Sequence, residues 1–314
     1  MFNIPILIIT YKREKSLKKI LNIVKTIDPI KLYISSNAPP KNNLEISDKV
    51  YNVRNIINNF KIKGNIYRLY RSKHLSVYDS IPKSINWFFL KEKYGIILED
   101  DCIPVKDFFY FCETLLKKYL NNKLINSIGG SNFCKKKISE IYYFSKYNHI
   151  WGWATWRRSW KNFDLNIKFW KKYKKTNHWK LLHDNDNEKE YWEKKFDKIY
   201  GGSIYTWDYS WQACAWYKSQ LSIIPNKPLV KNVGFDDEAT YTIGRNFNYN
   251  AMRTNLIIDK YNDNIIQNLE ADNDVFKNFF REGKKFKFAV LLLFTDPVLF
   301  FLKLKSYLTK LLLK

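Results

Sequence analysis

The chain has 314 residues, enough for one large domain or two small ones, and 46% of them are hydrophobic, which excludes an intrinsically disordered protein. Its 54 Lys and Arg outnumber its 30 Asp and Glu, and the resulting formal net charge of +24 attracts anions. Lys, Asn and Ile are all abundant, a pattern that a biased genome would also produce, so the charge alone identifies no partner. The four cysteines contain no C-x-x-C pair, and we expect reduced, mostly buried thiols.

The first third of the chain alternates strand and helix patterns. An apolar run at residues 4–9 predicts a buried strand, and apolar residues at helical spacing from 17 to 27 predict the helix after it. Further strands are expected at 32–34, 66–70 and 95–98, with a loop at 37–40 and a helix at 79–89. This alternation is typical of an α/β fold with a mostly parallel central sheet flanked by helices.

Polar residues follow three of these predicted strands. They are Thr10 and Tyr11, Asn37, and the consecutive acids Glu99-Asp100-Asp101, which we call the acidic trio. Ligands of parallel sheets bind beyond the carboxyl ends of the strands. The sequence therefore predicts a ligand site where these loops converge.

The rest of the chain changes character. Residues 142–216 are rich in Trp and Tyr, and the charged stretch 161–198 predicts helices in a solvated excursion. Asp296-Pro297 makes a good N-cap and first turn for a basic amphipathic helix over 298–313. Its apolar runs are shorter than the roughly 20 residues that span a bilayer. Such a helix suits an anionic membrane surface, and docking on the protein's own core is the alternative.

The acidic trio suits a divalent cation. Adjacent carboxylates repel one another, and a bound cation removes that penalty. Mg²⁺ or Mn²⁺ takes one or two carboxylates and fills its other positions with phosphate oxygens and water. A short acidic cluster facing a diphosphate is therefore chemically sensible, although most such clusters are solvated strand ends.

Asp208 is the candidate general base. It stands alone among aromatics in the segment YTWDYSW at 205–211, where desolvation would raise its pKa and strengthen it as a proton acceptor. The alternative is a buried Asp that caps a helix or pairs with a lysine.

An ordered series of motifs over residues 4–242 resembles the GT-A-fold glycosyltransferases, including the bacterial family-2-like enzymes. PILIITYKR at 5–13 is similar to their opening strand and loop, and GIILEDD at 95–101 to their D-x-D region. The E-D-D form is similar to that of N-acetylglucosaminyltransferase I. The likeness continues through WGWATW at 151–156 and WDYSW at 207–211 and ends near 233–235.

The resemblance implies a role for each matching residue. Asp101 would be the direct ligand of Mn²⁺ or Mg²⁺, Asp100 would contact the ribose or sugar, and Glu99 would support both. Asp208 matches the catalytic base of the similar inverting enzymes. The positions that would surround the nucleotide and its diphosphate are Thr10, Tyr11, Arg13, Asn37, where such enzymes often carry an Asp that reads uracil, and Lys231, in a basic loop.

The resemblance also implies an organisation and partners. We expect a GT-A catalytic domain at 1–284, with a nucleotide-binding half at 1–101, an acceptor half at 102–245 and an extension at 246–284. A basic amphipathic tail follows at 285–314. The expected donor is a nucleotide-sugar such as a UDP-sugar, and the acceptor a glycan or lipid-linked glycan. The tail would hold a cytoplasmic protein on the anionic inner face of the inner membrane.

Two other functions compete with this one. A sugar nucleotidyltransferase would use a similar scaffold, but no glycine-rich loop stands near the N-terminus to cradle a triphosphate. A non-enzymatic nucleic-acid-binding protein would fit the net charge of +24. We expect no nucleic-acid partner, because no recognised module is present and the acids at the strand ends would repel a phosphate backbone.

Overall fold

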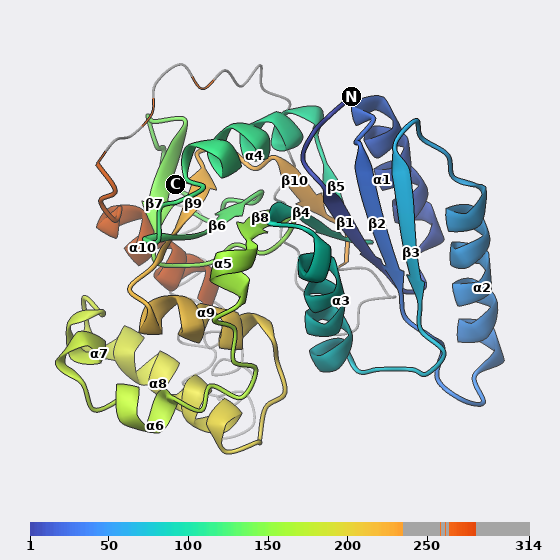
Figure 1. Cartoon of the computed structure of the whole chain (residues 1–314). Helices are drawn as coiled ribbons and strands as arrows, with labels where there is room; N and C mark the ends of the chain where they lie inside the picture. Colours follow the sequence, from blue (N-terminus) through green and yellow to red (C-terminus); the bar gives the residue numbers. More distant parts are fainter. Residues whose placement is uncertain (235–257, 259–260, 262–263, 281–314) are drawn as a thin grey trace, which may run out of the picture. The chain divides into compact units, whose positions relative to one another are not determined.

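An eight-stranded sheet organises the larger part of the computed structural model (Figure 1). The strand order is β3-β2-β1-β4-β8-β6-β9-β7, and a two-stranded sheet pairs β10 with β5. The bounds are β1 (Ile6–Thr10), β2 (Lys31–Ser36), β3 (Asn65–Tyr70), β4 (Tyr94–Glu99), β5 (Cys102–Pro104), β6 (Ile125–Gly129), β7 (Tyr142–Ser145), β8 (Trp153–Trp156), β9 (Leu221–Pro225) and β10 (Val230–Asn232).

The main sheet is mostly parallel. Strands β1 to β4 run in one direction, β6 and β9 share it, and only β7 and β8 run against their neighbours. The flanking helices are α1 (Glu14–Ile27), α2 (Leu44–Asn59), α3 (Val77–Lys91), α4 (Lys106–Lys118), α5 (Arg157–Trp160), α6 (Trp170–Tyr173), α7 (Asn177–Leu181), α8 (Asp186–Tyr200) and α9 (Asp208–Tyr217). The predicted α/β class, with a mostly parallel central sheet flanked by helices, is confirmed.

The structure describes residues 1–234, 258, 261 and 264–280, and these fall into two units. The first comprises Met1–Asn132 and Lys137–Asn268 and contains the sheet. In the second, Phe133–Lys136 accompanies α10 (Leu269–Val275) and a π-helix (Phe276–Phe280). There the rings of Phe133 and Phe279 stack at 4.0 Å. The tail predicted at 285–314 lies outside the described residues, and no helix in the described ranges is long and apolar enough to cross a membrane.

Alternation along β1 divides the core between the two faces of the sheet. Ile6 and Ile8 pack with the apolar stripe of α1 and with α4, whereas Leu7 and Ile9 pack with α3 and the start of α9. Successive strand residues point to opposite faces, so a strand that is apolar throughout is buried on both sides. Helices packed on both faces of the sheet fix the positions of the strand ends and of the loops that follow them.

The stretch 161–198 differs from the solvated excursion predicted for it. Helices form there, as expected, but their tryptophans build a second aromatic core while the lysines stay outside. This core contains Trp170, Trp179, Trp192, Phe196 and Trp216, each no more than 1% exposed. These aromatics are spread over a charged sequence with no regular period, so the sequence pattern did not predict their burial.

A buried ion pair joins this core to the sheet. The Nζ of Lys146 lies 2.9 Å from Glu188 Oε1, and both side chains are 1% exposed. Tyr147 donates its hydroxyl to the same carboxylate, and the His183 side chain, fully buried, lies against it. Although His183 stands beside Asp184 in a charged stretch of the sequence, its imidazole is buried and packs on Trp179 and Trp216.

Candidate functional site

The predicted site residues gather where β1, β2 and β4 end, which we call the carboxyl edge. Thr10 closes β1 beside Ser36 of β2, and Glu99 closes β4 opposite Ile9. Parallel pairing brings these ends to one side of the sheet, as the sequence predicted. Thr10 itself is buried, and its hydroxyl donates to the Ser35 carbonyl at 3.3 Å.

Asp100 joins the end of β4 to the loop after β1. Its carboxylate accepts the Tyr11 backbone N–H at 2.6 Å, and the Arg13 backbone N–H donates to it as well. Burial and the neighbouring charge of Asp101 raise the pKa of Asp100 to about 7, although the two N–H donors and the Arg13 guanidinium favour its ionised form. Asp100 therefore sets the course of the loop that carries Tyr11 and Arg13.

Asp101 lies against the strand that returns from the second half of the chain. Its carbonyl accepts the Val233 N–H at 2.9 Å, and a Cβ on Gly234 would come within 2.2 Å of its Oδ2. Only glycine leaves room for this approach. Lys231 lies in the same strand, β10, exposed and paired with Ile103 just after the trio.

Asp208 reaches the carboxyl edge through aromatic packing. It begins α9, where Trp207 stacks on Trp153 at 6.1 Å and 25°, and Trp211 packs on the same ring. Trp153 is the first residue of β8, paired with Ile97 of β4, two residues before Glu99. Trp153 is 1% exposed, so it is a core residue.

Four carboxylates share the resulting electrostatic environment. Burial raises the pKa of Glu99 well above its usual range, and the charges of Asp101, Asp100 and Asp208 raise it further, against the guanidinium of Arg13. Burial also raises the pKa of Asp208, against hydrogen bonds from Thr206 and from the Tyr209 N–H at 2.9 Å. The structure thus brings Asp208 within electrostatic range of Glu99.

The oxygen donors here fit a hard divalent cation. Neighbouring carboxylates that raise one another's pKa repel each other when ionised, and a bound cation offsets that repulsion. Mg²⁺ or Mn²⁺ needs only one or two carboxylate ligands. Among the described residues, no group of three or more His, Cys, Asp or Glu side chains is arranged to hold a metal ion by itself. A metal here would take its remaining ligands from water and from a bound phosphate.

Asn37 is used by the protein itself. Its amide donates to the Leu75 carbonyl at 2.8 Å and accepts the Leu75 N–H at 3.2 Å and the Ala38 N–H at 3.0 Å. These bonds hold the loop between β3 and α3 beside the end of β2. A role of Asn37 toward a nucleotide stays a prediction, and its side chain is engaged with the backbone of Leu75 and Ala38.

Arg71 is a cation that the sequence reasoning missed. It follows β3 directly, and its N–H donates to the Ser36 carbonyl at 3.0 Å. Its guanidinium donates to Ser84 Oγ at 3.3 Å through Nη2, while its Nε is buried without a hydrogen-bond partner. A basic residue at the end of a third strand was the signal that could have revealed it.

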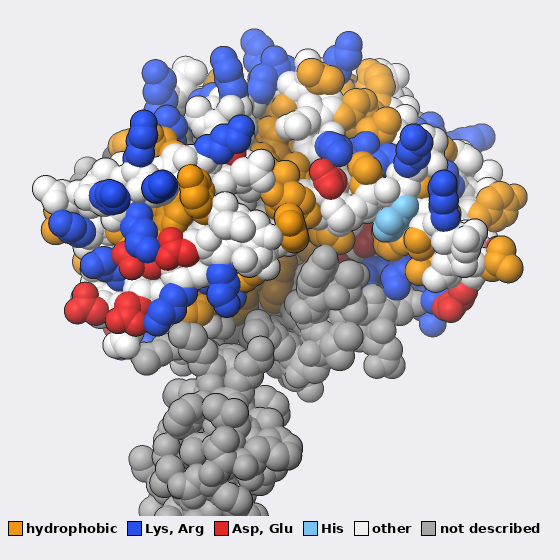
Figure 2. All heavy atoms as spheres, turned by 90° about the horizontal axis from the view of Figure 1, so that it is seen from below, with side chains coloured by type: hydrophobic (Ala, Val, Ile, Leu, Met, Phe, Trp, Pro, Cys, Tyr) orange, Lys and Arg blue, Asp and Glu red, His pale blue; other side chains and the backbone are white. Residues whose placement is uncertain are grey.

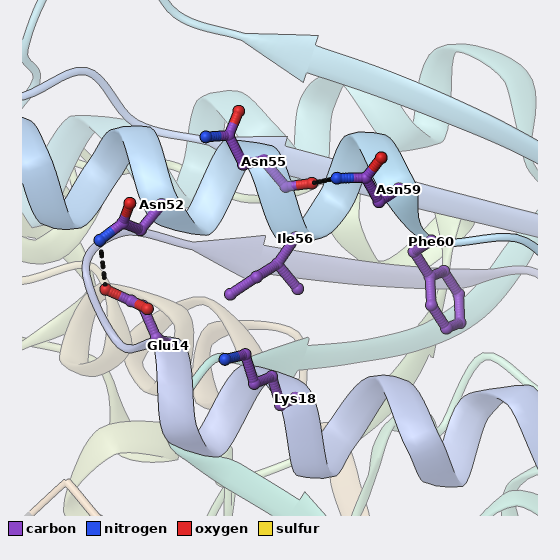
Figure 3. Close-up of a pocket in the computed structure, with 7 residues that line it drawn as sticks. All are labelled: Glu14, Lys18, Asn52, Asn55, Ile56, Asn59 and Phe60. Atoms are coloured by element: carbon purple, nitrogen blue, oxygen red, sulfur yellow. Dashed lines mark hydrogen bonds between the residues drawn. The ribbon is translucent and has the colours of Figure 1, made fainter.

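A separate open cavity of about 560 Å³ lies between α1 and α2 (Figure 3). Asn52, Asn55 and Asn59 line it from α2, and Asn52 bonds Glu14 of α1 at 3.0 Å. None of the predicted site residues lines it. Figure 2 shows Lys and Arg spread over the face seen from below, with Asp and Glu in a few places, so this face attracts anions.

No family model matches the chain, and no curated protein matches it in sequence. Similar solved structures include 4-diphosphocytidyl-2C-methyl-D-erythritol synthase from Anaerococcus prevotii, with 12% identity, 62% of this chain and 83% of that chain covered, and a TM-score of 0.33. The glycosyltransferase GlyE in Streptococcus pneumoniae is 10% identical, with 71% of this chain and 45% of that chain covered and a TM-score of 0.34. Apo UDP-glucose pyrophosphorylase is 8% identical, with 72% of this chain and 90% of that chain covered and a TM-score of 0.34. These likenesses identify neither a family nor a reaction for this chain.

Proposed function

We propose that the protein is a metal-dependent GT-A-type glycosyltransferase that moves a sugar from a nucleotide-diphosphate donor, a UDP-sugar, to a hydroxyl of a glycan or lipid-linked glycan. The observation that carries the proposal is the proximity of Asp208 to Glu99, the first residue of the acidic trio. Three acids at a strand end and one acid at a helix start, from opposite halves of the chain, suit a reaction with a leaving diphosphate and an attacking hydroxyl.

The donor would lie across the ends of β1 and β2. Tyr11 and Arg13 lie in the loop that Asp100 holds, Thr10 precedes them at the end of β1, and Asn37 fixes the neighbouring loop. The guanidinium of Arg13 offsets the acidic charge and would contact phosphate oxygens. Lys231, exposed on β10 beside the trio, would add a second positive charge to the diphosphate.

Asp101 would be the metal ligand, with Glu99 and Asp100 beside it. When bound, Mn²⁺ or Mg²⁺ supplies positive charge that stabilises the departing diphosphate. Because Gly234 has no Cβ, the Asp101 carboxylate can lie close to the backbone that follows β10.

Asp208 would act as the general base. The acceptor hydroxyl oxygen forms a bond to the anomeric carbon while the bond from that carbon to the diphosphate oxygen breaks, and the hydroxyl proton passes to Asp208. Attack opposite the leaving group inverts the anomeric centre. Burial raises the pKa of Asp208, which strengthens it as a proton acceptor, and bonds from Thr206 and the Tyr209 N–H orient its carboxylate.

The test is a panel of UDP-, GDP-, CDP- and dTDP-sugars, with and without Mn²⁺. Binding is measured by calorimetry, and slow donor hydrolysis by release of nucleoside diphosphate. We expect Mn²⁺-dependent binding and hydrolysis of at least one UDP-sugar, both weakened in Asp101→Ala while circular dichroism stays unchanged. Absence of binding across the whole panel, or full activity of Asp101→Ala, would contradict the proposal.

A further inference from the structure

An aromatic pair joins Tyr78, which is partly buried, to Tyr205, which is exposed and lies three residues before Asp208. The rings of Tyr78 and Tyr205 meet edge to face, with centroids 5.5 Å apart and planes at 80°. Tyr205 is 66% exposed, although it stands only three residues before Asp208 and next to Thr206, which bonds the Asp208 carboxylate. A large aromatic side chain left in solvent beside a candidate base has a surface available for a ligand.

The pair is held by contacts from three segments. Tyr78 lies at the start of α3, just beyond the loop that Asn37 fixes, and its hydroxyl donates to Asn166 Oδ1 at 2.8 Å. The loop around Asn166 is tied in turn to α9, because the Ser210 hydroxyl donates to the Leu165 carbonyl at 2.7 Å. Tyr78 therefore has a fixed position relative to the helix that begins at Asp208, and Tyr205 packs on it.

We propose that Tyr78 and Tyr205 form a stacking platform for the acceptor, and that the acceptor residue bound there is a pyranose sugar. The inference rests on the proposed function, since it assigns the pair to the hydroxyl-bearing substrate. A pyranose ring presents an apolar face of C–H groups, and these pack on the face of a tyrosine ring. Its hydroxyls, at the ring edge, need polar partners nearby.

The surroundings of the pair supply such partners. Asn166 and the Tyr78 hydroxyl form a polar rim on one side of the platform. Asp208 follows Tyr205 by three residues in the chain, and in this proposal it accepts the proton of the hydroxyl that attacks. Lys195, whose Nζ lies 5.5 Å from the centroid of the Tyr209 ring, adds a cation next to Asp208. An apolar surface with polar groups at its edge is how proteins orient a sugar.

Saturation-transfer difference NMR on the full chain with UDP and Mn²⁺ tests the platform. The probes are the methyl glycosides of glucose, galactose, N-acetylglucosamine, mannose and rhamnose, which share the C–H face. We expect at least one to receive saturation at its ring protons, and Tyr205→Ala and Tyr78→Ala to reduce that signal at least fivefold. Tyr205→Phe should retain it, whereas Tyr205→Leu, which keeps bulk without an aromatic face, should lose it.

Tyr200→Ala is the matched control, because Tyr200 is also exposed but lies at the end of α8. Signals that persist in Tyr205→Ala, or no signal from any probe on the wild-type chain, would overturn the platform. UDP binding, measured on the same samples by calorimetry, reports separately on the proposed function. Variants that bind UDP normally yet lose the sugar signal support the platform, and a wild-type chain that binds no nucleotide contradicts the transferase.

Discussion

The charge of Asp208 raises the pKa of Glu99, although the two residues come from opposite halves of the chain. Glu99 reaches this position as the last residue of β4, and Asp208 as the first residue of α9. The contact between their elements runs through Trp153, which pairs with β4 and stacks on Trp207.

Removing the proton acceptor should slow turnover without affecting the donor. Asp208→Asn keeps the size of the side chain but cannot take a proton, so we expect kcat to fall by roughly 10²- to 10⁴-fold while UDP-sugar affinity changes little. Steady-state rates and calorimetry on the same preparation measure both. Glu190→Gln, an exposed acid of α8, is the control, and undiminished turnover in Asp208→Asn would rule out its role as base.

A methyl group at Gly234 should disturb the metal ligand. The new Cβ would meet Asp101 Oδ2 at 2.2 Å, so the carboxylate must move. We expect Gly234→Ala to weaken Mn²⁺ binding by about 10- to 100-fold, as changes beside a metal ligand do. Electron paramagnetic resonance of free Mn²⁺ measures this. Gly201→Ala, whose nearest contact would be 3.2 Å, should bind normally, and equal affinities in both variants would contradict the placement of Asp101.

Acid should unfold the protein partly through His149. This histidine is buried, and burial lowers its pKa from 6.5 to about 4, against the bond between Nδ1 and the Ser131 carbonyl. The unfolded chain then binds the proton more tightly than the folded one. The stability contributed is fully present above pH 6.5 and falls by about 3 kcal/mol as the pH drops toward 4.

Urea titrations at pH 7, 5.5 and 4.5 measure that slope. His149→Gln should flatten the slope below pH 6.5, whatever it does to stability at pH 7. The same change at the exposed His74 should leave the slope as it is. Parallel slopes for wild type and His149→Gln would show that another group is responsible.

The ion pair of Lys146 with Glu188 should be costly to break from one side. Lys146→Met leaves the Glu188 carboxylate buried without its cation, and we expect a loss of about 3–5 kcal/mol in the free energy of unfolding. Lys146→Met with Glu188→Gln should recover part of it, because the buried charge is then gone. Lys194→Met, in the exposed pair with Glu190, should change stability by less than about 1 kcal/mol, and equal losses at both sites would refute the argument.

The strands of the first half could be predicted from the sequence, because each is a short apolar run before a polar loop. β1, β2, β3 and β4 lie within two residues of their predicted bounds. Helix α2 was missed, since its buried stripe is only Val50, Val53 and Ile57 within a polar sequence. The strands β6 to β9 were missed as well. Parallel and antiparallel neighbours alternate in this half of the sheet, and local sequence periodicity does not show which strands pair.

The candidate site was predictable in its residues and not in its contacts. Strand ends marked Thr10 and the acidic trio, and an isolated acid among aromatics marked Asp208. No local pattern shows that Gly234 approaches Asp101, or that Asn37 is engaged with Leu75, because both contacts depend on tertiary packing. The sequence did not distinguish Tyr205 from the other aromatic residues of its segment, and only the structure shows that its side chain is exposed.

The bond from the Val233 N–H to the Asp101 carbonyl also has a consequence for the order of folding. It closes a loop that contains the whole second half of the sheet, the aromatic core of α6 to α9, and Asp208. Contacts so distant in sequence form late, because the entropy of closing the loop must be overcome first. A nascent chain of which only the first hundred residues or so have been synthesised therefore contains β1 to β4 and the acidic trio. The site is completed only after the segment of β10 has docked beside Asp101.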